Sequence, residues 1–423
     1  MSVKDLATKN TKDTKKVWPT VRLGDVCKVL TDGDWIESKD QSETGIRLIQ
    51  TGNIGNGVFE RKDNRARYIS DATFSKLNCT EIYSGDVLIS RLPEPVGRAC
   101  IVEDMGCRMI TAVDCSIVRF TNEVDSRFFI QYSQSSDYQA QVSAQLTGTT
   151  RARISRKHLS SVLIPCPPLS VQREIVARLE KELGEADRLA VKFTRVAELA
   201  DDAFKAELDE TFKALEDNSR RDAEARRVRL GDVCEFVRNG ANIKQRKGAV
   251  GIPITRIETL SGGVFNSQKV GYADIMNKKP FEKHIVGIGD LLISHINSAQ
   301  FVGRTVMYRG EINGPIIHGM NLLRARLLDS GKILPAYVEL WFKTISARIY
   351  ISGVTKKSVN QASVNTTDFK RMPIIRPPIS TQRAIIAKLD AAKERCEKLK
   401  AAAMRGLAAA ENLRKAILAE AFE

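Results

Sequence analysis

The sequence predicts an α+β protein with two similar globular domains, joined by two long antiparallel coiled-coil helices in a pseudo-twofold internal duplication. Two observations predict this class. Five blocks of sequence occur twice in the same order, and two long helical stretches carry apolar residues at heptad-like spacing. A chain of 423 residues has room for two domains of ordinary size and for the helices as well.

The duplication is visible in five collinear blocks, which recur at offsets between 204 and 210 residues. The blocks are VRLGDVC at 21–27 and 228–234, GIRLIQTGNIGNGVF at 45–59 with GIPITRIETLSGGVF at 251–265, GDVLIS at 85–90 with GDLLIS at 289–294, VGRACIV at 96–102 with VGRTVMY at 302–308, and PPLSVQREIVARLE at 167–180 with PPISTQRAIIAKLD at 377–390. A repeat of roughly 200 residues is too long for a solenoid unit. Each copy is therefore a domain-sized body.

Each copy begins with short β-rich segments separated by Gly, Asn and Asp, a pattern typical of strands and turns. We expect VRLGDVC to form the opening strand of each domain, and the stretches 126–145 and 335–353 to be helical. The predicted segments are a flexible basic tail at 1–17, globular domains at 18–167 and 228–377, and long helices at 168–227 and 378–423.

Each long helix follows a Pro-Pro pair and a serine that suits the N-cap, Ser170 or Ser380. At about 1.5 Å per residue each helix reaches roughly 65–70 Å, so it overruns its globule and needs a partner, the nearest being the other helix. The alternative is two unrelated surface helices, each packed on its own globule. The apolar stripes are Ile175, Leu179, Leu183, Ala186, Ala190, Phe193, Ala197, Ala200, Leu208, Phe212 and Leu215, and Leu389, Ala392, Cys396, Leu399, Ala403, Gly406, Ala410, Leu413, Ile417 and Ala421.

Composition narrows the class of protein. Hydrophobic residues make up 43% of the chain, enough for real cores, and no run of eighteen apolar residues predicts a membrane span. The N-terminus lacks the apolar region of a secretory signal, and the eight cysteines show neither C-x-x-C pairs nor zinc-site spacing. We therefore expect a reducing, cytoplasmic location and no metal site.

Motifs that carry catalysis are missing from the sequence. It contains no G-x-x-x-x-G-K-[ST], G-x-G-x-x-G, H-E-x-x-H or G-x-S-x-G. The two Pro-Pro pairs lack the preceding acid or amide and the following aromatic residue of amino-methyltransferases, so they are interpreted as helix-entry prolines. The chain has only four histidines, so few side chains are present that could serve as general acid or base near neutral pH. The chain is expected to recognise a ligand rather than to catalyse a reaction.

The net charge of +15 indicates a polyanionic partner, most often nucleic acid. The excess is concentrated in one place. Residues 228–376 hold 22 Lys and Arg against 10 Asp and Glu, whereas residues 1–167 hold 23 against 20. Two similar modules at a fixed separation suit two DNA half-sites, and the divergence between the copies favours two different half-sites.

These features resemble the specificity (S) subunit of a type I restriction–modification system, which defends a cell against foreign DNA. The resemblance covers Trp18 to Glu423 and rests on LGD-V, GD-LIS and VGR in each domain and PP-S-QR at each helix. It implies two target-recognition domains that each recognise half of a split sequence, with the coil setting the gap. It also implies docking of two methyltransferase subunits and of restriction subunits.

Under this resemblance the chain itself is non-catalytic and holds no cofactor, and S-adenosylmethionine, ATP and Mg²⁺ belong to the partner subunits. One departure from the expected pattern is the weakly basic first domain. Two other function classes stay open at this point: a coiled-coil adaptor whose globules bind proteins, and a nuclease or methyltransferase in its own right.

Residues shared by both copies are expected to be structural, among them Leu23, Gly24 and Val26 with their counterparts Leu230, Gly231 and Val233. Asp25 and Asp232, beside glycine, are interpreted as turn or cap residues.

Polar residues that differ between the copies and lie between shared blocks are the candidates for DNA contact, since Arg and Lys suit guanine or phosphate and Asn and Gln suit adenine. They fall in five short loops, 91–95, 147–157, 239–248, 295–301 and 354–363. The alternative is that these loops are merely solvated. The candidates are Arg91, Thr149, Arg151, Arg153, Lys157, Lys244, Arg246, Lys247, His295, Asn297, Gln300, Lys356, Lys357, Asn360 and Gln361.

Overall fold

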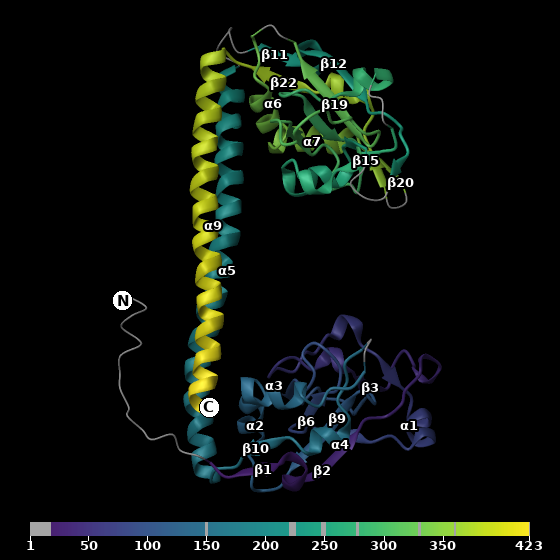
Figure 1. Ribbon diagram of the computed structural model, residues 1–423, viewed down its shortest axis with the longest axis vertical. Helices are drawn as coiled ribbons and strands as arrows, with labels where there is room; N and C mark the ends of the chain where they lie inside the picture. Colours follow the sequence, from purple (N-terminus) through teal and green to yellow (C-terminus); the bar gives the residue numbers. More distant parts are fainter. Residues whose placement is uncertain are drawn as a thin grey trace. The chain divides into compact units, whose positions relative to one another are not determined.

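The computed structural model describes residues 18–148, 151–219, 226–246, 251–275, 279–328, 331–358 and 361–422 (Figure 1). The tail predicted at 1–17 lies outside them. The chain forms two compact units. The first contains the residues up to Thr194 together with those from Arg405 onward, and the second contains Arg195–Met404. Each unit therefore holds one globular domain and a stretch of both long helices, whereas the predicted boundaries divide the chain into successive segments.

The first unit is built on two four-stranded sheets. One has the antiparallel order β2 (Cys27–Asp32), β9 (Cys115–Phe120), β6 (Val87–Ser90), β7 (Ala99–Ile101). The other has the order β4 (Tyr68–Ile69), β3 (Ile46–Ile49), β8 (Met109–Thr111), β5 (Glu81–Ile82), in which only β3 and β8 are parallel. A two-stranded ladder joins β1 (Thr20–Arg22) to β10 (Leu163–Pro165). The short helices are α1 (Asp71–Leu77), α2 (Ser126–Tyr132), α3 (Ser136–Ser143) and α4 (Arg156–Ser160).

The second unit repeats this plan with the sheet β12 (Cys234–Asn239), β19 (Leu322–Leu327), β16 (Leu291–Ser294), β18 (Thr305–Met307). Its β11 (Arg226–Arg229) pairs with β22 (Pro373–Arg376) as β1 pairs with β10. Two three-stranded sheets complete it, β13 (Gln245–Arg246), β15 (Gly271–Ala273), β14 (Ile252–Ile254) and β17 (Ile296–Asn297), β21 (Gln361–Ser363), β20 (Lys356–Ser358). Its short helices are α6 (Pro335–Trp341), α7 (Ile345–Val354) and α8 (Thr366–Arg371).

The GD-LIS blocks form β6 and β16, the central buried strands of these sheets. Every residue of Val87–Ser90 is buried, and the strand packs alternate side chains into two cores, with Val87 and Ile89 in one and Leu88 in the other. In the second unit Leu291 and Ile293 face one core and Leu292 another. A strand that is buried on both faces has apolar residues at consecutive positions. For this reason no charged residue interrupts the strand in either copy.

The repeated heptapeptide is not one strand, as predicted, but a strand end, a 3₁₀ turn and a strand start. The turns span Leu23–Val26 and Leu230–Val233, and each buries its Leu and Val. The turn places Gly24 against Ser160 and Gly231 against Lys370, so closely that a Cβ would lie 3.0–3.1 Å from the neighbouring side chain. Asp232 accepts a hydrogen bond from the Arg229 N–H at 3.1 Å, the cap role expected for it.

The helices predicted at 126–145 and 335–353 are each two helices. The first of the pair, α2, ends at Tyr132, and Ser135 then caps α3 by accepting a hydrogen bond from the Tyr138 N–H at 3.2 Å. Thr344 caps α7 in the same way through the Ala347 N–H. Ser and Thr side chains compete with the helical backbone, so an apolar period alone does not reveal such a break.

The long helices are α5 (Leu169–Ser219) and α9 (Ile379–Phe422), and they pair antiparallel. In the first unit Arg414 contacts Asp187 at 2.8 Å. In the second, Lys400 contacts Asp201 at 2.8 Å and Arg395 contacts Glu207 at 3.1 Å, so positions rise along α5 as they fall along α9. The antiparallel coiled coil is confirmed, and the alternative of unrelated surface helices is wrong.

Most of the predicted stripe is buried in the seam, but Leu399 and Leu413 are exposed. A helix has 3.6 residues per turn, so residues at strict heptad spacing rotate slowly around it. Some of them therefore end up outside the face that a single partner helix covers. Leu418, next to the predicted Ile417, takes the buried place instead. At Gly406 a Cβ would lie 2.4 Å from the ring of Phe193, so glycine there permits the close packing of the two helices.

The glutamine of each PP-S-QR block ties its helix to the preceding domain. Gln172 is fully buried, accepts a hydrogen bond from the Asp125 N–H at 2.8 Å, and donates to the carbonyls of Glu123 and Pro167 at 2.7 Å. Gln382 makes the same three contacts with Leu334, Lys332 and Pro377 at 2.8–2.9 Å. The block is repeated because both copies use one amide to satisfy three backbone groups.

Replacing Gln382 with Leu is expected to lower the free energy of unfolding by about 2 kcal/mol, because buried backbone donors and acceptors lose their partner. Chemical denaturation measures the change. Gln268→Leu, at an exposed glutamine of the same unit, serves as the control and should cost less than about 0.5 kcal/mol. Equal effects of the two substitutions would show that the buried amide does not hold the helix.

Candidate nucleic-acid interface

The aspartate of each GD-LIS block supports the sheet from which the candidate loops extend. Asp86 accepts two hydrogen bonds from Arg119 at 2.8 Å and one from the Tyr83 N–H. Asp290 accepts two from Arg326 at 2.7 and 2.9 Å and one from the Gly287 N–H. The same bidentate pair in both copies shows that this acid is structural.

The second domain adds a buried arginine to this pair. Arg324 is 2% exposed, donates to the carbonyls of Lys283 and Ile285, and lies 3.5 Å from Asp290. Its guanidinium also lies over the ring of Phe236. Burial lowers the pKa of Arg324 to about 10, so the group stays charged at neutral pH and depends on Asp290 for neutralisation.

Two of the predicted loops of the second domain meet in one small sheet. Strand β17, from the 295–301 loop, pairs with β21 and β21 pairs with β20, both from the 354–363 loop. This sheet presents Lys356 and Lys357 to solvent, and Gln361 is exposed on the neighbouring strand. Asn360 lies outside the described residues. The structure therefore joins residues about sixty positions apart into a basic polar platform, which we define as Lys356, Lys357 and Gln361.

The 295–301 loop contributes unequally to this surface. His295 is buried, and burial lowers its pKa, so its ring is neutral and turned away from solvent. Asn297 is half-buried and donates to the Ser294 hydroxyl at 3.2 Å. Gln300 is exposed. Of the three candidates, Gln300 has the side chain most accessible to a ligand.

The third loop of the second domain follows β12. Its start is fixed by Gly240, where a Cβ would lie 2.1 Å from the carbonyl oxygen of Gly319. Lys244 is exposed, and Arg246 belongs to the short strand β13. Lys247 lies outside the described residues.

The first domain brings its two predicted loops together around two acids. The Ile154 N–H donates to the Arg91 carbonyl at 3.3 Å. Arg91 is buried and pairs with Asp32 at 2.5 Å, and Arg153 pairs with Asp114 at 2.6 Å. Arg151 and Lys157 are exposed, and Thr149 lies outside the described residues. The basic side chains nearest the loop junction are therefore neutralised by carboxylates.

Three exposed features of the first domain were not among the sequence candidates. Glu94 is the exposed charged residue of the 91–95 loop. Trp35 is 68% exposed in the loop after β2, the counterpart of the 239–248 loop after β12. A basic stretch at 61–67 exposes Arg61, Lys62, Arg65 and Arg67. Aligning the loops after each VRLGDVC block would have found Trp35, and a local charge count would have found the basic stretch.

Two histidines, His284 and His318, lie near Arg324 in the second domain. His318 is fully buried, and its Nε2 lies 2.8 Å from the Leu322 carbonyl. Burial, with the nearby charge of Arg324, lowers the pKa of His318 to about 3. Burial, reinforced by Lys283, also lowers the pKa of His284. Protonation at these rings would add charge beside an arginine that is already buried.

The second unit is expected to lose stability as the pH falls from about 6.5 towards 3. In the unfolded chain His318 binds a proton at its ordinary pKa, whereas the folded protein resists it, so each pH unit below about 6.5 costs about 1.4 kcal/mol. Denaturant unfolding at pH 7 and 5.5 measures this loss. His318→Gln should reduce the loss by about 1 kcal/mol over that interval. An unchanged pH dependence in the variant contradicts the assignment.

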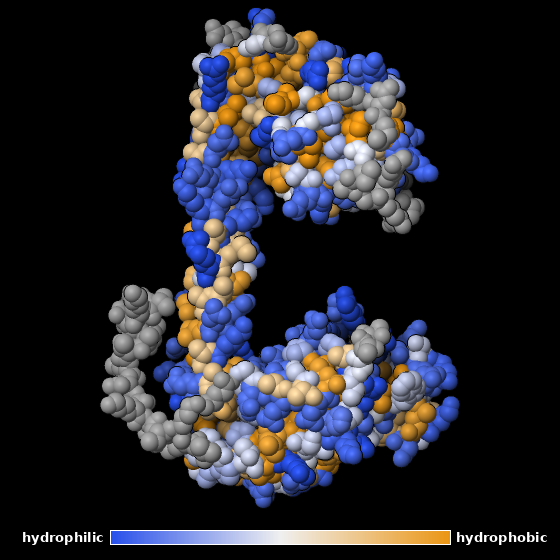
Figure 2. Space-filling view, viewed as in Figure 1, coloured by the Kyte–Doolittle hydropathy of each residue, from blue (hydrophilic) through white to orange (hydrophobic). Residues whose placement is uncertain are grey.

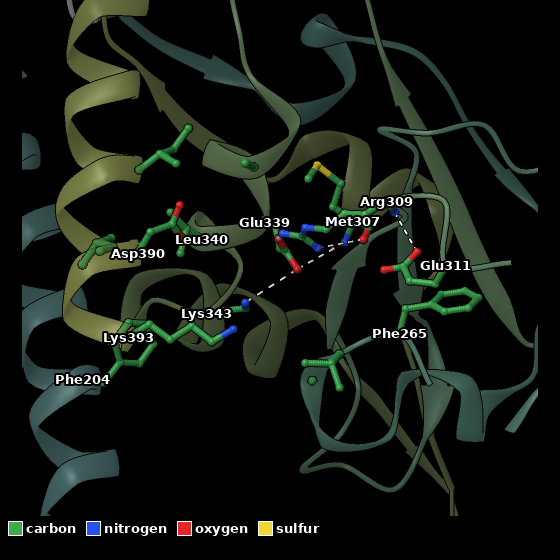
Figure 3. Close-up of a pocket in the computed structure, with 15 residues that line it drawn as sticks. Phe204, Phe265, Met307, Arg309, Glu311, Glu339, Leu340, Lys343, Asp390 and Lys393 are labelled. Carbon is green, nitrogen blue, oxygen red and sulfur yellow. Dashed lines mark hydrogen bonds and ion pairs between the residues drawn. The ribbon is translucent and has the colours of Figure 1, made fainter. Parts of the chain in front are cut away.

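A hollow of about 490 Å³ lies in the second unit, where both long helices and the globular domain line it with apolar and charged residues (Figure 3). Glu339 is buried at its wall and lies 2.6 Å from Arg309 and 3.7 Å from Lys343. Burial lowers the pKa of Lys343. Because two cations neutralise the carboxylate, the arrangement favours a structural role for Glu339.

Within the described ranges, no three His, Cys, Asp or Glu side chains are grouped so that they could hold a metal ion. No helix in that part of the chain is both long and apolar enough to cross a membrane.

Comparison with known proteins shows to which family the chain belongs. The sequence model of the type I restriction modification DNA specificity domain matches residues 15–185 and again residues 224–403. The chain belongs to this family. The two matches correspond to the two copies of the duplication, so this specificity subunit carries two recognition domains, each followed by its long helix.

The specificity subunit is similar to curated relatives along different lengths. The MjaX type I restriction enzyme specificity subunit of Methanocaldococcus jannaschii is 37% identical over 156 residues, which cover 37% of this chain and 36% of that protein. The EcoKI specificity subunit of Escherichia coli K12 is 24% identical over 393 residues, or 89% of this chain and 82% of the relative.

Solved structures show the same fold. A chain from a study of complex assembly and conformational transition of the type I R-M system aligns with a TM-score of 0.67 at 21% identity, over 98% of this chain and 99% of that one. The HsdS subunit of Thermoanaerobacter tengcongensis aligns with a TM-score of 0.52 at 19% identity, over 96% and 97%.

As a specificity subunit, the chain is the non-catalytic DNA-recognition component of a type I restriction–modification complex. The family assignment is therefore adopted in place of the two other function classes that the sequence left open. These were a protein-binding adaptor and an independent nuclease or methyltransferase. DNA contact by the individual candidate side chains stays a prediction.

Proposed function

We propose that this specificity subunit recognises a bipartite, asymmetric DNA sequence, with one half-site for each recognition domain. The observation that carries the proposal is the contrast between frame and loops. Both domains share the Asp–Arg pair beneath the sheet and the buried glutamine at the helix start, yet their exposed loops carry different side chains. A frame shared by both copies, with loops that differ between them, suits two modules that bind the same polymer at different base sequences.

In the second domain we assign DNA contact to the exposed polar residues of the platform and its neighbouring loops. Lys356 and Lys357 suit phosphate or guanine, and Gln300 and Gln361 suit adenine. Lys244 extends the basic surface. His295 is assigned a supporting role because it is buried.

In the first domain the proposed contacts are less basic. Arg151 and Lys157 are exposed, Glu94 suits the amino group of cytosine, and Trp35 offers a flat apolar surface. Arg91 supports the loop through Asp32. This arrangement accounts for a domain of low net charge that binds DNA through a few specific groups and through the basic stretch at 61–67.

We further propose that two methyltransferase subunits dock on the long helices and that restriction subunits join this core. Figure 2 shows apolar residues among the charged ones on the helix surfaces. Apolar side chains that neither helix covers provide the contact area for partners. They are Leu189, Val191 and Leu413 in the first unit, and Leu199, Leu399 and Met404 in the second.

S-adenosylmethionine, ATP and Mg²⁺ are proposed as cofactors of those partners. The proposed location is the cytoplasm, and the eight free cysteines support a reducing compartment.

The proposal is tested by co-expressing the chain with a methyltransferase subunit encoded beside it and mapping every methylated base in the host DNA. We expect one motif of two unlike half-sites separated by a gap of fixed length. A contiguous palindrome, or methylation without a common motif, contradicts the proposal. A duplex containing the mapped motif should then bind the purified complex, with an affinity that falls steeply as salt is raised.

A further inference from the structure

The loop between the GD-LIS and VGR blocks of the first domain is held by an arginine of the VGR block itself. Arg98 is buried, with 7% of its surface exposed. Within the loop it donates to the carbonyls of Leu92 at 2.8 Å and Pro95 at 3.0 Å. It also donates to Thr51 at 2.8 Å and Ile54 at 2.6 Å in the segment after β3. One guanidinium therefore connects both ends of the exposed tip at Glu94 to a second loop.

The equivalent arginine of the second domain does not do this. Arg304 donates to the Leu260 carbonyl at 3.3 Å and lies over the ring of Phe301. The loop is held instead by Arg348 of α7, which donates to the carbonyls of Val302 at 2.7 Å and Gln300 at 2.9 Å. The loop is thus held from the residue before β7 in the first domain and from helix α7 in the second.

The first domain confirms that this exchange is reciprocal. When the capped helices α3 and α7 are aligned at their N-caps, Gln139 takes the place of Arg348. Gln139 donates at 3.0 Å to the carbonyl of Ser133, a residue outside the 91–95 loop. Among the described residues, each domain thus has an arginine whose guanidinium donates to two backbone carbonyls at its loop, Arg98 in the first domain and Arg348 in the second.

We propose that Arg98 and Arg348 are the positioning residues for base recognition, each fixing the loop of its own domain. The inference rests on the proposed function, because it takes these loops to contact DNA. Charge-assisted hydrogen bonds to two carbonyls within a short loop, or to one within it and one directly after it, restrict the loop to one conformation. Discrimination between bases needs donors and acceptors held in place, so a loosened loop binds correct and incorrect bases more equally.

The test uses the complex with its methyltransferase partner and the motif mapped for the wild type. Arg98→Gln and Arg348→Gln are each co-expressed, and methylation is scored at sites with one changed base in either half. Each variant should lose about tenfold in discrimination at one half-site and keep it at the other, and the two variants should affect opposite halves. Arg98→Lys, which keeps the charge but lacks the fork geometry, should give an intermediate result.

Two controls separate positioning from stability. Ile69→Ala weakens a core cluster that contains neither clamp, and it should lower the melting temperature without relaxing either half-site. Arg304→Gln removes the long hydrogen bond to Leu260 and the stacking on Phe301, but no hydrogen bond to a carbonyl of the 295–301 loop, so it should relax the second half-site less than Arg348→Gln does. If Ile69→Ala relaxes recognition as Arg98→Gln does, or if both clamp variants affect the same half or neither, the inference is overturned. A wild type without a bipartite motif would instead contradict the proposed function. If Arg98→Gln does not fold, Arg348→Gln and Arg304→Gln decide the question.

Discussion

Replacing Asp290 with Ala is expected to lower the free energy of unfolding by about 3–5 kcal/mol, the largest stability change predicted for this chain. Asp290 is 1% exposed and is the shared acid of two arginines, Arg324 and Arg326. Without it, Arg324 keeps a buried charge and loses the carboxylate that lies 3.5 Å away. The backbone carbonyls accept hydrogen bonds from the N–H groups of Arg324, but they do not neutralise its positive charge.

The matched variant is Asp86→Ala in the first domain, which should cost less. Its partner Arg119 is partly exposed and can be solvated, and among the described residues Asp86 pairs with no second arginine. Asp232→Ala, at an exposed cap, should cost about 1 kcal/mol. Denaturant unfolding of the three variants gives the ranking. A loss at Asp290 no greater than at Asp86 would show that Arg324 does not need this neutralisation.

Reversing two charges on the platform, Lys356→Glu with Lys357→Glu, is expected to reduce affinity for duplex DNA by roughly 100-fold at low salt. Both lysines are exposed on β20, a short strand that is ordered by its pairing with β21, so the change adds repulsion towards phosphate without disturbing a core. If each lysine contacts one phosphate, the slope of log affinity against log salt should become shallower by about 2.

The control carries the same change of charge on a long helix, Lys393→Glu with Lys398→Glu. Fluorescence anisotropy with a labelled duplex over a range of salt concentrations compares the two. The helix variant should bind close to the wild-type affinity. If both variants weaken binding equally, the effect belongs to net charge and the platform is not a contact surface.

The fold class could be predicted because its signals are long and repeated. Five blocks at nearly constant offset define the two copies. The apolar stripes are long enough for each helix to extend beyond its own globular domain, and this length predicts that the helices pair. Local breaks were harder to detect. A side-chain hydrogen bond such as that of Ser135 or Thr344 starts a new helix without interrupting the apolar period.

The candidate loops could be located, but the exposure of their side chains could not. Arg91 and Lys356 are both basic residues in divergent loops, yet one is buried against Asp32 and the other faces solvent. Asp32 precedes Arg91 by 59 positions, and no local pattern connects them. The clamp shows the same limit, because Arg348 lies on a helix outside the loop that it holds.

The composition of the first unit has a consequence for synthesis on the ribosome. Its residues up to Thr194 are completed by those from Arg405 onward, which are translated only after the whole second unit. Until then the apolar face of α5 at Leu179 and Leu183 lacks Leu418, and Phe128 and Tyr132 lack the ring of Phe422. The recognition domain made first is therefore the last to be finished. A nascent chain that stops before Arg405 should expose this apolar face, and it should therefore be prone to aggregation and degradation. Incomplete subunits are thereby removed in preference to complete ones.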